Sequence, residues 1–372
     1  MRAFLIVVAF FCAPAFAQTQ RQAPVAPAPT HQQKPFPPPD FVLRDAPHKE
    51  PKSGVQIGPG QITIVQGVGT PTVINALSFS ADGKVLAAGK DFGRVVLWDV
   101  QEREFLRALE TGQGIVSAVA LSPDGKTVAT GGSSDHFSVK LWDVATGKLL
   151  KVLKEDQDFI QCLVFDLTGK WLAVADNTGK AYVLDVVSGA PGLRLADTHV
   201  ARFSRDGSML MTADQKEFSI WSTTDWSKTR VIPRWQGFPT LIALNTAADR
   251  FAVYQSWGVR LIRLSSAEAI EGLTDVLPKT STGKPNFAEF SADGSLLYAT
   301  VAGRLWVWDT STNKVCSTPV MYSGGGALST DNRWLAGSKD DSVFSTERTD
   351  GVWVWDTSHL LAACDMQAPL RN

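Results

Sequence analysis

A short pattern recurs seven times between Val73 and Asp356, and it limits the folds that this chain can adopt. Each copy contains a short apolar strand, a turn with Ser and Asp, a second apolar strand, a second turn and a third strand. The third strand ends at an anchor position, which is Trp in five copies. The anchors are Trp98, Trp142, Leu184, Trp221, a position near Arg263, Trp308 and Trp355, spaced 37 to 47 residues apart.

A period of about 40–45 residues with four short strands per copy is the signature of a propeller blade. Asp-Gly between two apolar runs, as at Asp82 and Gly83, predicts a hairpin because glycine accepts a positive φ without steric cost. The length of 372 residues would otherwise suggest two or three domains, but blades stack side by side into one ring. The sequence therefore predicts an all-β fold, a seven-bladed β-propeller of four-stranded antiparallel blades over residues 61–366.

Four copies carry a literal Trp-Asp pair at the anchor, and Trp221 occupies the same position without the Asp. The four pairs are Trp98 and Asp99, Trp142 and Asp143, Trp308 and Asp309, and Trp355 and Asp356. This pattern resembles the WD-repeat family of β-propellers, in a secreted, bacterial-type form, from about Gly60 to Asp356. The family's usual Gly-His pair is missing from every copy, so we expect the blades to depend more on packing than on the family's polar network of His, Ser or Thr, and Trp.

The N-terminal residues have the pattern of a secretory signal peptide. Arg2 precedes an apolar run, and Ala15 and Ala17 form an A-x-A cleavage site, so residues 1–17 are expected to be removed. Residues 18–60 hold 10 of the 20 prolines and are predicted to be a disordered, semi-rigid linker. The alternative is a proline-rich ligand for an aromatic groove. We expect a protein that is secreted or periplasmic.

Ring closure has two candidates in the sequence. The outermost strand of the last blade is expected to come either from residues 62–66 or from the tail at residues 359–364. The first is favoured because its side chains alternate as in a strand and several are β-branched. Cys316 and Cys364 occupy nearly equivalent outer positions, and they form either a disulfide or two unpaired thiols. Cys162 reads as a small buried hydrophobe.

No motif for catalysis or for metal binding occurs in the chain. The five histidines do not pair at metal spacing, and the turns account for most of the aspartates. No set of cofactor or metal ligands can be assembled at a central channel. We therefore predict no enzyme activity, no cofactor and no metal. The formal net charge of -1 argues against binding to nucleic acid, and no segment after the signal peptide is apolar enough to insert into a membrane.

The resemblance implies that the turns between second and third strands open onto one face that receives partners. Several of these turns carry aromatic and charged residues, which interfaces favour, although Phe92 and Phe137 could instead tuck under their own turns. A longer turn at residues 338–351 is the best single candidate. We predict a monomeric, non-catalytic scaffold for protein partners outside the cytoplasm; the alternative is an enzyme or small-ligand binder that uses the channel. The candidate partner-binding residues are Phe92, Phe137, Trp257, Lys339, Asp340, Asp341, Phe344 and Arg348.

Overall fold

The structure is a computed structural model of the 372-residue chain. The chain divides into two compact units, Met1–Gln33 and Lys34–Asn372, and every described residue lies in the second. The structure describes residues 39–44, 73–133, 138–155, 159–198, 200–214, 216–233, 241–245, 249–255, 258–268, 287–301, 304–317, 325–338 and 351–366.

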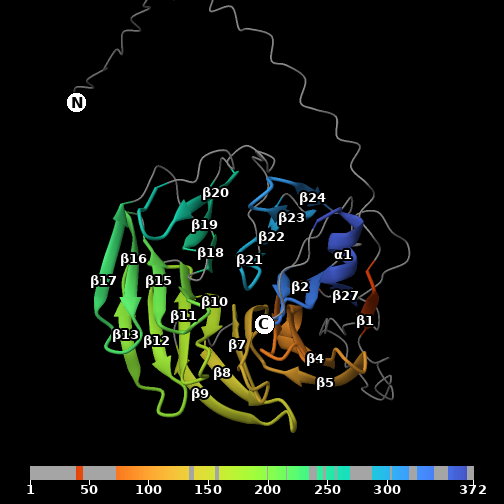
Figure 1. The fold of residues 1–372 in the computed structure, drawn as a ribbon. Helices are drawn as coiled ribbons and strands as arrows, with labels where there is room; N and C mark the ends of the chain where they lie inside the picture. Colours follow the sequence, from red (N-terminus) through yellow and green to blue (C-terminus); the bar gives the residue numbers. More distant parts are fainter. Residues whose placement is uncertain are drawn as a thin grey trace, which may run out of the picture. The chain divides into compact units, whose positions relative to one another are not determined.

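The second unit is a ring of seven antiparallel sheets, one per sequence repeat (Figure 1). Blades one to three contain β2 (Ile74–Phe79), β3 (Val85–Lys90), β4 (Arg94–Asp99), β5 (Glu104–Glu110); β6 (Val116–Leu121), β7 (Thr127–Gly132), β8 (Ser138–Asp143), β9 (Leu149–Glu155); and β10 (Ile160–Phe165), β11 (Trp171–Asp176), β12 (Ala181–Asp185), β13 (Pro191–Leu195). Blades four to six contain β14 (Val200–Phe203), β15 (Met209–Ala213), β16 (Glu217–Ser222), β17 (Lys228–Pro233); β18 (Leu241–Asn245), β19 (Arg250–Gln255), β20 (Gly258–Arg263); and β21 (Phe287–Phe290), β22 (Leu296–Val301), β23 (Arg304–Asp309), β24 (Val315–Ser317). Blade seven contains β25 (Gly326–Leu328), β26 (Trp334–Ser338), β27 (Gly351–Asp356) and β1 (Phe41–Arg44). The predicted seven-bladed β-propeller is confirmed.

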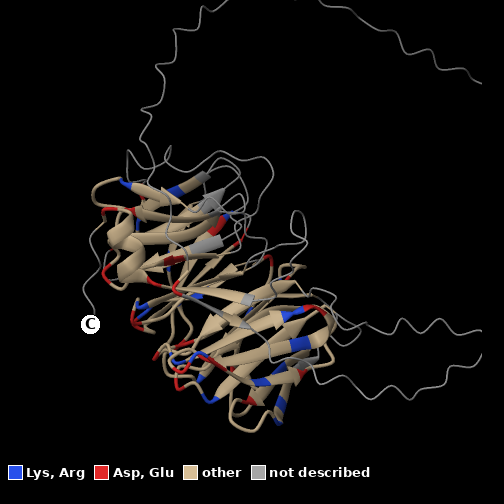
Figure 2. Cartoon of the chain, turned by 90° about the vertical axis from the view of Figure 1, so that its right-hand side faces the viewer, with Lys and Arg blue, Asp and Glu red and all other residues tan. Residues whose placement is uncertain are grey.

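The first turn of five blades is built by the same pair of side chains, a Ser and an Asp. In blade one, the Ser80 hydroxyl donates to Asp82 (2.7 Å) and accepts from the Val85 N–H (2.9 Å), while Asp82 also accepts from the Lys84 N–H. Gly83 completes the turn at φ 68°. The same Ser and Asp pair recurs at Ser122 and Asp124, Ser204 and Asp206, Ser291 and Asp293, and Ser329 and Asp331. The acidic residues accordingly gather at the turns in Figure 2, which explains why so many aspartates have a structural role.

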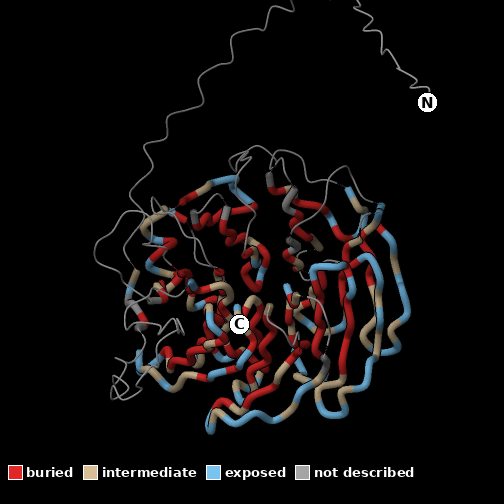
Figure 3. The backbone as a smooth tube through the Cα atoms, turned by 180° about the vertical axis from the view of Figure 1, so that it is seen from behind, coloured by how far each residue is buried: buried red, intermediate tan, exposed pale blue. Residues whose placement is uncertain are grey.

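The anchor residues pack between neighbouring blades. Trp98, Trp308 and Trp355 are almost completely buried, and Trp142 is buried as well. Each lies in a separate apolar cluster formed by two adjacent sheets. Burial is nearly continuous along the second and third strands, such as β3, β4, β7 and β11, whereas many exposed positions follow the outer strands (Figure 3). The hydrophobic core is therefore divided among the blade boundaries.

Hydrogen bonds to the anchor tryptophan are present in blades two and four although the Gly-His pair is missing. The Trp142 indole N–H donates to the Thr130 hydroxyl (3.0 Å), which donates to the Gln113 side chain (2.5 Å). Gln113 also donates to the Thr130 carbonyl (3.2 Å). In blade four, the Trp221 indole donates to Thr212 (2.9 Å). Gln113 supplies both a donor and an acceptor, so it can complete the network without a histidine.

An N-terminal strand closes the ring, but it is not the expected one. Strand β1 pairs with β27, with Phe41 opposite Val354, and the Leu43 side chain is buried in the core beside Val352. The favoured segment, residues 62–66, lies outside the described residues. Residues 41–44 were assigned to the proline-rich linker, and this part of it belongs to blade seven.

The C-terminal tail, the rival candidate for closure, forms a helix. Helix α1 (Thr357–Ala363) begins at Asp356, whose carboxylate accepts from the Ser358 N–H. Asp40 fixes the N-terminal strand against this helix, since it accepts from the Asp356 N–H (2.6 Å) and lies 2.7 Å from His359 Nδ1. In the described part of the chain, no helix is long and apolar enough to cross a bilayer.

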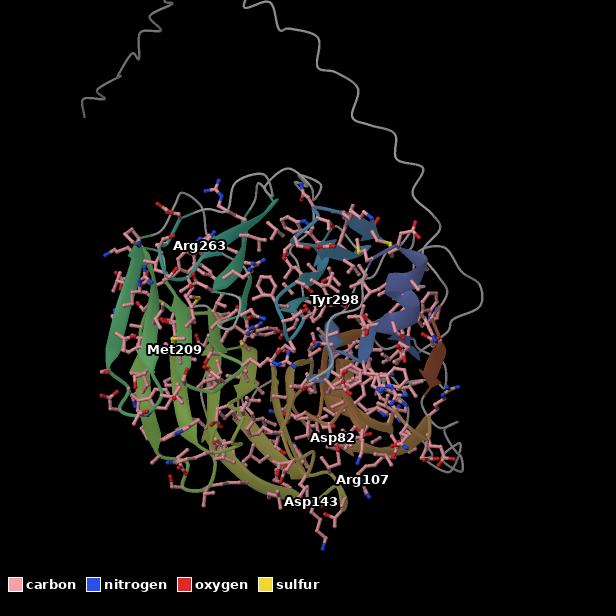
Figure 4. The ribbon with its side chains drawn as sticks, viewed as in Figure 1. Asp82, Arg107, Asp143, Met209, Arg263 and Tyr298 are labelled. Carbon is pink, nitrogen blue, oxygen red and sulfur yellow. A yellow bond between two sulfur atoms is a disulfide. The ribbon has the colours of Figure 1, made fainter. Side chains whose placement is uncertain are left out.

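Outer strands are joined to the following blade at one repeated position, here called the bridging position. It lies opposite the residue that precedes the anchor, and it is occupied by Arg107, Lys151, Leu193, Arg230 and Cys316 in blades one, two, three, four and six. The Arg107 guanidinium donates to the carbonyls of Val144 (3.2 Å), Ala145 and Thr146 (2.9 Å), and it lies beside Asp143 in Figure 4.

The other polar bridging residues act across the next boundary in the same way. Lys151 donates to the Val187 carbonyl (2.5 Å), and Arg230 donates to the carbonyls of Leu264 and Ser265 (2.6 Å). Cys316 forms a disulfide with Cys364, at the end of α1. Of the two alternatives left open by the sequence, the structure thus contains the disulfide.

Candidate functional site

Only one of the eight candidate partner-binding residues can be placed. Phe92 is described, in the turn between β3 and β4. The long turn of blade seven lies between Ser338 at the end of β26 and Gly351 at the start of β27. The candidates that lie outside the described residues are Phe137, Trp257, Lys339, Asp340, Asp341, Phe344 and Arg348.

Phe92 is exposed and has an unusual backbone conformation. Its side chain is 56% exposed, so it does not tuck under its own turn. Its backbone lies in the left-handed region, at φ 62° and ψ 27°, which costs a bulky residue free energy because Cβ crowds the backbone. Such strain persists only where the surroundings impose it, and it is concentrated at functional sites.

Hydrogen bonds on both sides of Phe92 impose this conformation. The Asp91 carboxylate accepts from the Asn75 side chain (2.9 Å), and the Gly93 N–H donates to the Gly114 carbonyl. The Gly93 carbonyl in turn accepts from the Thr111 N–H (2.7 Å). A Cβ at Gly93 would lie 3.1 Å from the Gln113 nitrogen, so only glycine permits this close approach of the two loops.

Two further exposed apolar side chains flank Phe92. Val73 is 41% exposed, and its carbonyl accepts from the Asp91 N–H (3.3 Å). Ile115 is 42% exposed and follows Gly114 in the adjoining loop. Together Val73, Phe92 and Ile115 form the Phe92 patch, at the face where the turns between second and third strands lie. Lys90, at the end of β3, is fully buried and adds no exposed charge to the patch.

The inner strands enclose a central channel with a volume of about 970 Å³. One inner-strand position, opposite the middle of the second strand, is small or apolar in five blades. These residues are Ser78, Ala120, Val164, Ala243 and Ala327. In blades four and six the same position is occupied by Arg202 and Glu289, opposite Met211 and Tyr298. Two opposite charges thus line the channel at a repeat position that is small or apolar in the other five blades.

The charged cluster in the channel consists of Arg202, Arg205 and Glu289. Arg202 donates from Nη1 to the Cys162 Sγ (2.9 Å) and to the Ala201 carbonyl (3.0 Å). Glu289 is exposed toward the channel, yet the protein around it desolvates its carboxyl and raises the pKa despite the attraction of both arginines. Desolvation also lowers the pKa of Arg205, although Glu289, Asp331 and Asp293 attract it.

Sequence reasoning missed this cluster, although the signal was present. Comparing the seven copies at the inner-strand position would have shown Arg202 and Glu289 as the two exceptions to a run of small residues. Cys162, read as a buried hydrophobe, is half-buried and faces the Arg202 guanidinium. Among the described residues, no group of three or more His, Cys, Asp or Glu could hold a metal ion.

Comparison with known families agrees with the architecture. Residues 103–143 match the WD40 family, described as WD domain, G-beta repeat. Together with the seven blades, this match supports a WD-repeat β-propeller. The matched segment begins at β5 and ends with β8, so the sequence repeat is offset by one strand from the blade. A search of curated proteins finds no match to the chain. WD-repeat propellers are commonly protein-interaction scaffolds without catalytic activity.

Proposed function

We propose that this WD-repeat propeller is a non-catalytic scaffold outside the cytoplasm, which binds a protein partner through the face that carries the Phe92 patch. The observation that carries this proposal is the exposure of Phe92 in a left-handed backbone conformation. A solvated turn at this site would be more stable with glycine. A bulky aromatic residue held there at a cost in stability is best explained by a contact between its side chain and a protein partner.

The patch fits the core of an interface. Burying a phenylalanine side chain contributes roughly 1.5–3 kcal/mol, and aromatic anchors at the centre of an interface carry much of its binding energy. A specific interface needs about 800 Å² from each partner, more than three side chains provide. We propose that the other candidates from the sequence supply the remainder, namely Phe137, Trp257 and the turn at residues 338–351.

The location outside the cytoplasm rests on two features. Residues 1–17 have the signal-peptide pattern, and the Cys316–Cys364 disulfide suits an oxidising compartment. We propose that the proline-rich segment is a spacer that holds the propeller away from its neighbours. We also propose that the propeller acts as a monomer.

Site-specific photo-crosslinking tests the interface directly. A photoreactive amino acid is placed at position 92 and, as a control, at Leu150 on the outer strand β9, which is also 56% exposed. The chain is then irradiated in its native cell envelope. We expect a defined crosslinked protein from position 92 and none from position 150. Equal capture at both positions, or retention of that partner by Phe92→Ala, would contradict the proposal.

A further inference from the structure

Two oppositely charged side chains, Arg205 and Glu289, line a pocket that adjoins the channel. Within the described ranges, neither Arg205 nor Glu289 makes a hydrogen bond or an ion pair within 4.0 Å. The two side chains nevertheless attract each other electrostatically, each acting on the pKa of the other. Both line a smaller pocket of about 160 Å³ that adjoins the channel, while Glu289 and Arg202 line the channel itself.

Such an arrangement is unusual for a structural ion pair. A charged group removed from bulk water is normally paired and hydrogen bonded, because its desolvation is otherwise uncompensated. Arg202 is also only partly engaged, since both of its hydrogen bonds leave from Nη1. The guanidinium groups therefore keep donors for an oxyanion, and Glu289 keeps both oxygens for a cation or a donor.

The elements that carry these groups come from different sides of the ring. Arg202 lies on β14 and Arg205 in the turn after it, whereas Glu289 lies on β21, two blades further along the chain. In the structure, Glu289 forms no ion pair within 4.0 Å with Arg202 or Arg205. A molecule between them can contact both.

The charges around the site exclude a simple anion as the best ligand. Glu289, Asp293 and Asp331 all act electrostatically on Arg205, so an added anion would meet three carboxylates as well as two guanidinium groups. A ligand that also carries a cation removes this conflict, because its ammonium group would stabilise the Glu289 carboxylate. We propose that the channel binds a small amino carboxylate, with its carboxylate at Arg202 and Arg205 and its ammonium group at Glu289.

Calorimetric titration of the mature chain tests this site with probes that differ in charge spacing. Glycine, β-alanine and γ-aminobutyrate carry both charges, whereas butyrate and butylamine each carry one. We expect saturable binding of at least one amino carboxylate, at least about tenfold tighter than either single-charge analogue, as the loss of a hydrogen-bonded charge predicts. Butyrate binding as tightly as γ-aminobutyrate, or no saturable binding up to about 10 mM, would overturn the proposal.

Two variants separate the roles of the charges. Arg205→Gln and Glu289→Gln should each weaken binding about tenfold or more, while Arg263→Gln, on the exposed side of β20 far from the channel (Figure 4), should not. Because neither channel residue has a direct partner, we expect both variants to fold with an unchanged or higher melting temperature. Tighter binding of butyrate to Glu289→Gln, with unchanged binding of amino carboxylates, would show a plain anion site and refute the proposal.

Discussion

Cys316 in β24 occupies the same repeat position as Arg107 in β5, since each lies opposite the residue that precedes its blade's anchoring tryptophan. Arg107 reaches the carbonyls of the next blade's turn, and Cys316 is bonded to the segment that follows the next blade's last strand. The same point on the outer rim is therefore used to join neighbouring blades by different chemistry. Because each blade contacts mainly its neighbours, these bridges should influence the stability of the whole ring.

Removal of the disulfide should destabilise the propeller strongly. The bond closes a segment of 48 residues, for which loop-closure entropy gives about 4 kcal/mol. We expect Cys316→Ser to lower the melting temperature in calorimetry by roughly 5–10 °C. A reductant should shift the wild-type protein to the value of the variant and leave the variant unmoved. Cys162→Ser is the control, because it keeps the disulfide and its response to reductant.

Arg107→Ala should cost about 1–3 kcal/mol of unfolding free energy. The substitution leaves the turn carbonyls of Val144 and Thr146 without their charged donor. Arg107→Lys should recover part of the loss, because Lys151 performs the same task with a single hydrogen bond in blade two. Lys126→Ala removes only an exposed ion pair and should change stability by less than about 0.5 kcal/mol. If chemical denaturation gives equal losses of unfolding free energy for Arg107→Ala and Lys126→Ala, Arg107 does not stabilise the boundary between the blades.

The ring could be predicted because its determinants are local and repeated. Each Ser and Asp pair builds its own turn, so the pattern is visible in five of the seven copies. The closing strand could not be found in this way, because residues 41–44 form a strand only through their pairing with β27. The channel charges were missed for a related reason: Arg202 and Glu289 are distant in sequence, and only closure of the ring brings them to one cavity.

Ring closure should respond to pH through His359. The hydrogen bond that the Asp40 carboxylate accepts from His359 Nδ1, aided by the charges of Asp40 and Asp356, raises the pKa of His359. A raised pKa contributes stability that is complete below the unfolded pKa of about 6.5 and is lost as the pH rises through the folded value. The difference in melting temperature between wild type and His359→Gln should therefore be larger at pH 6 than at pH 8.

Asp40 provides the control for this dependence. Asp40→Asn removes the charge that holds the proton on His359, so a second change to His359→Gln should have little further effect at either pH. A difference between wild type and His359→Gln that is the same at pH 6 and pH 8 would show that the Asp40 contact does not depend on the proton.

Replacing Phe92 by glycine should increase stability and abolish partner binding. Glycine adopts the backbone φ of 62° without steric cost, so we expect a gain of about 1 kcal/mol in unfolding free energy, measured by denaturant titration. The loss of the phenyl side chain removes the centre of the Phe92 patch. The partner crosslinked at position 92 should therefore no longer be captured by affinity purification. Arg103→Gly is the matched control, because Arg103 also has a positive φ, of 61°, but lies in the turn between β4 and β5. It should gain similar stability and keep the partner. If Phe92→Gly binds the partner as tightly as the wild-type protein, the phenyl side chain has no part in binding, and the strain at this turn has another cause.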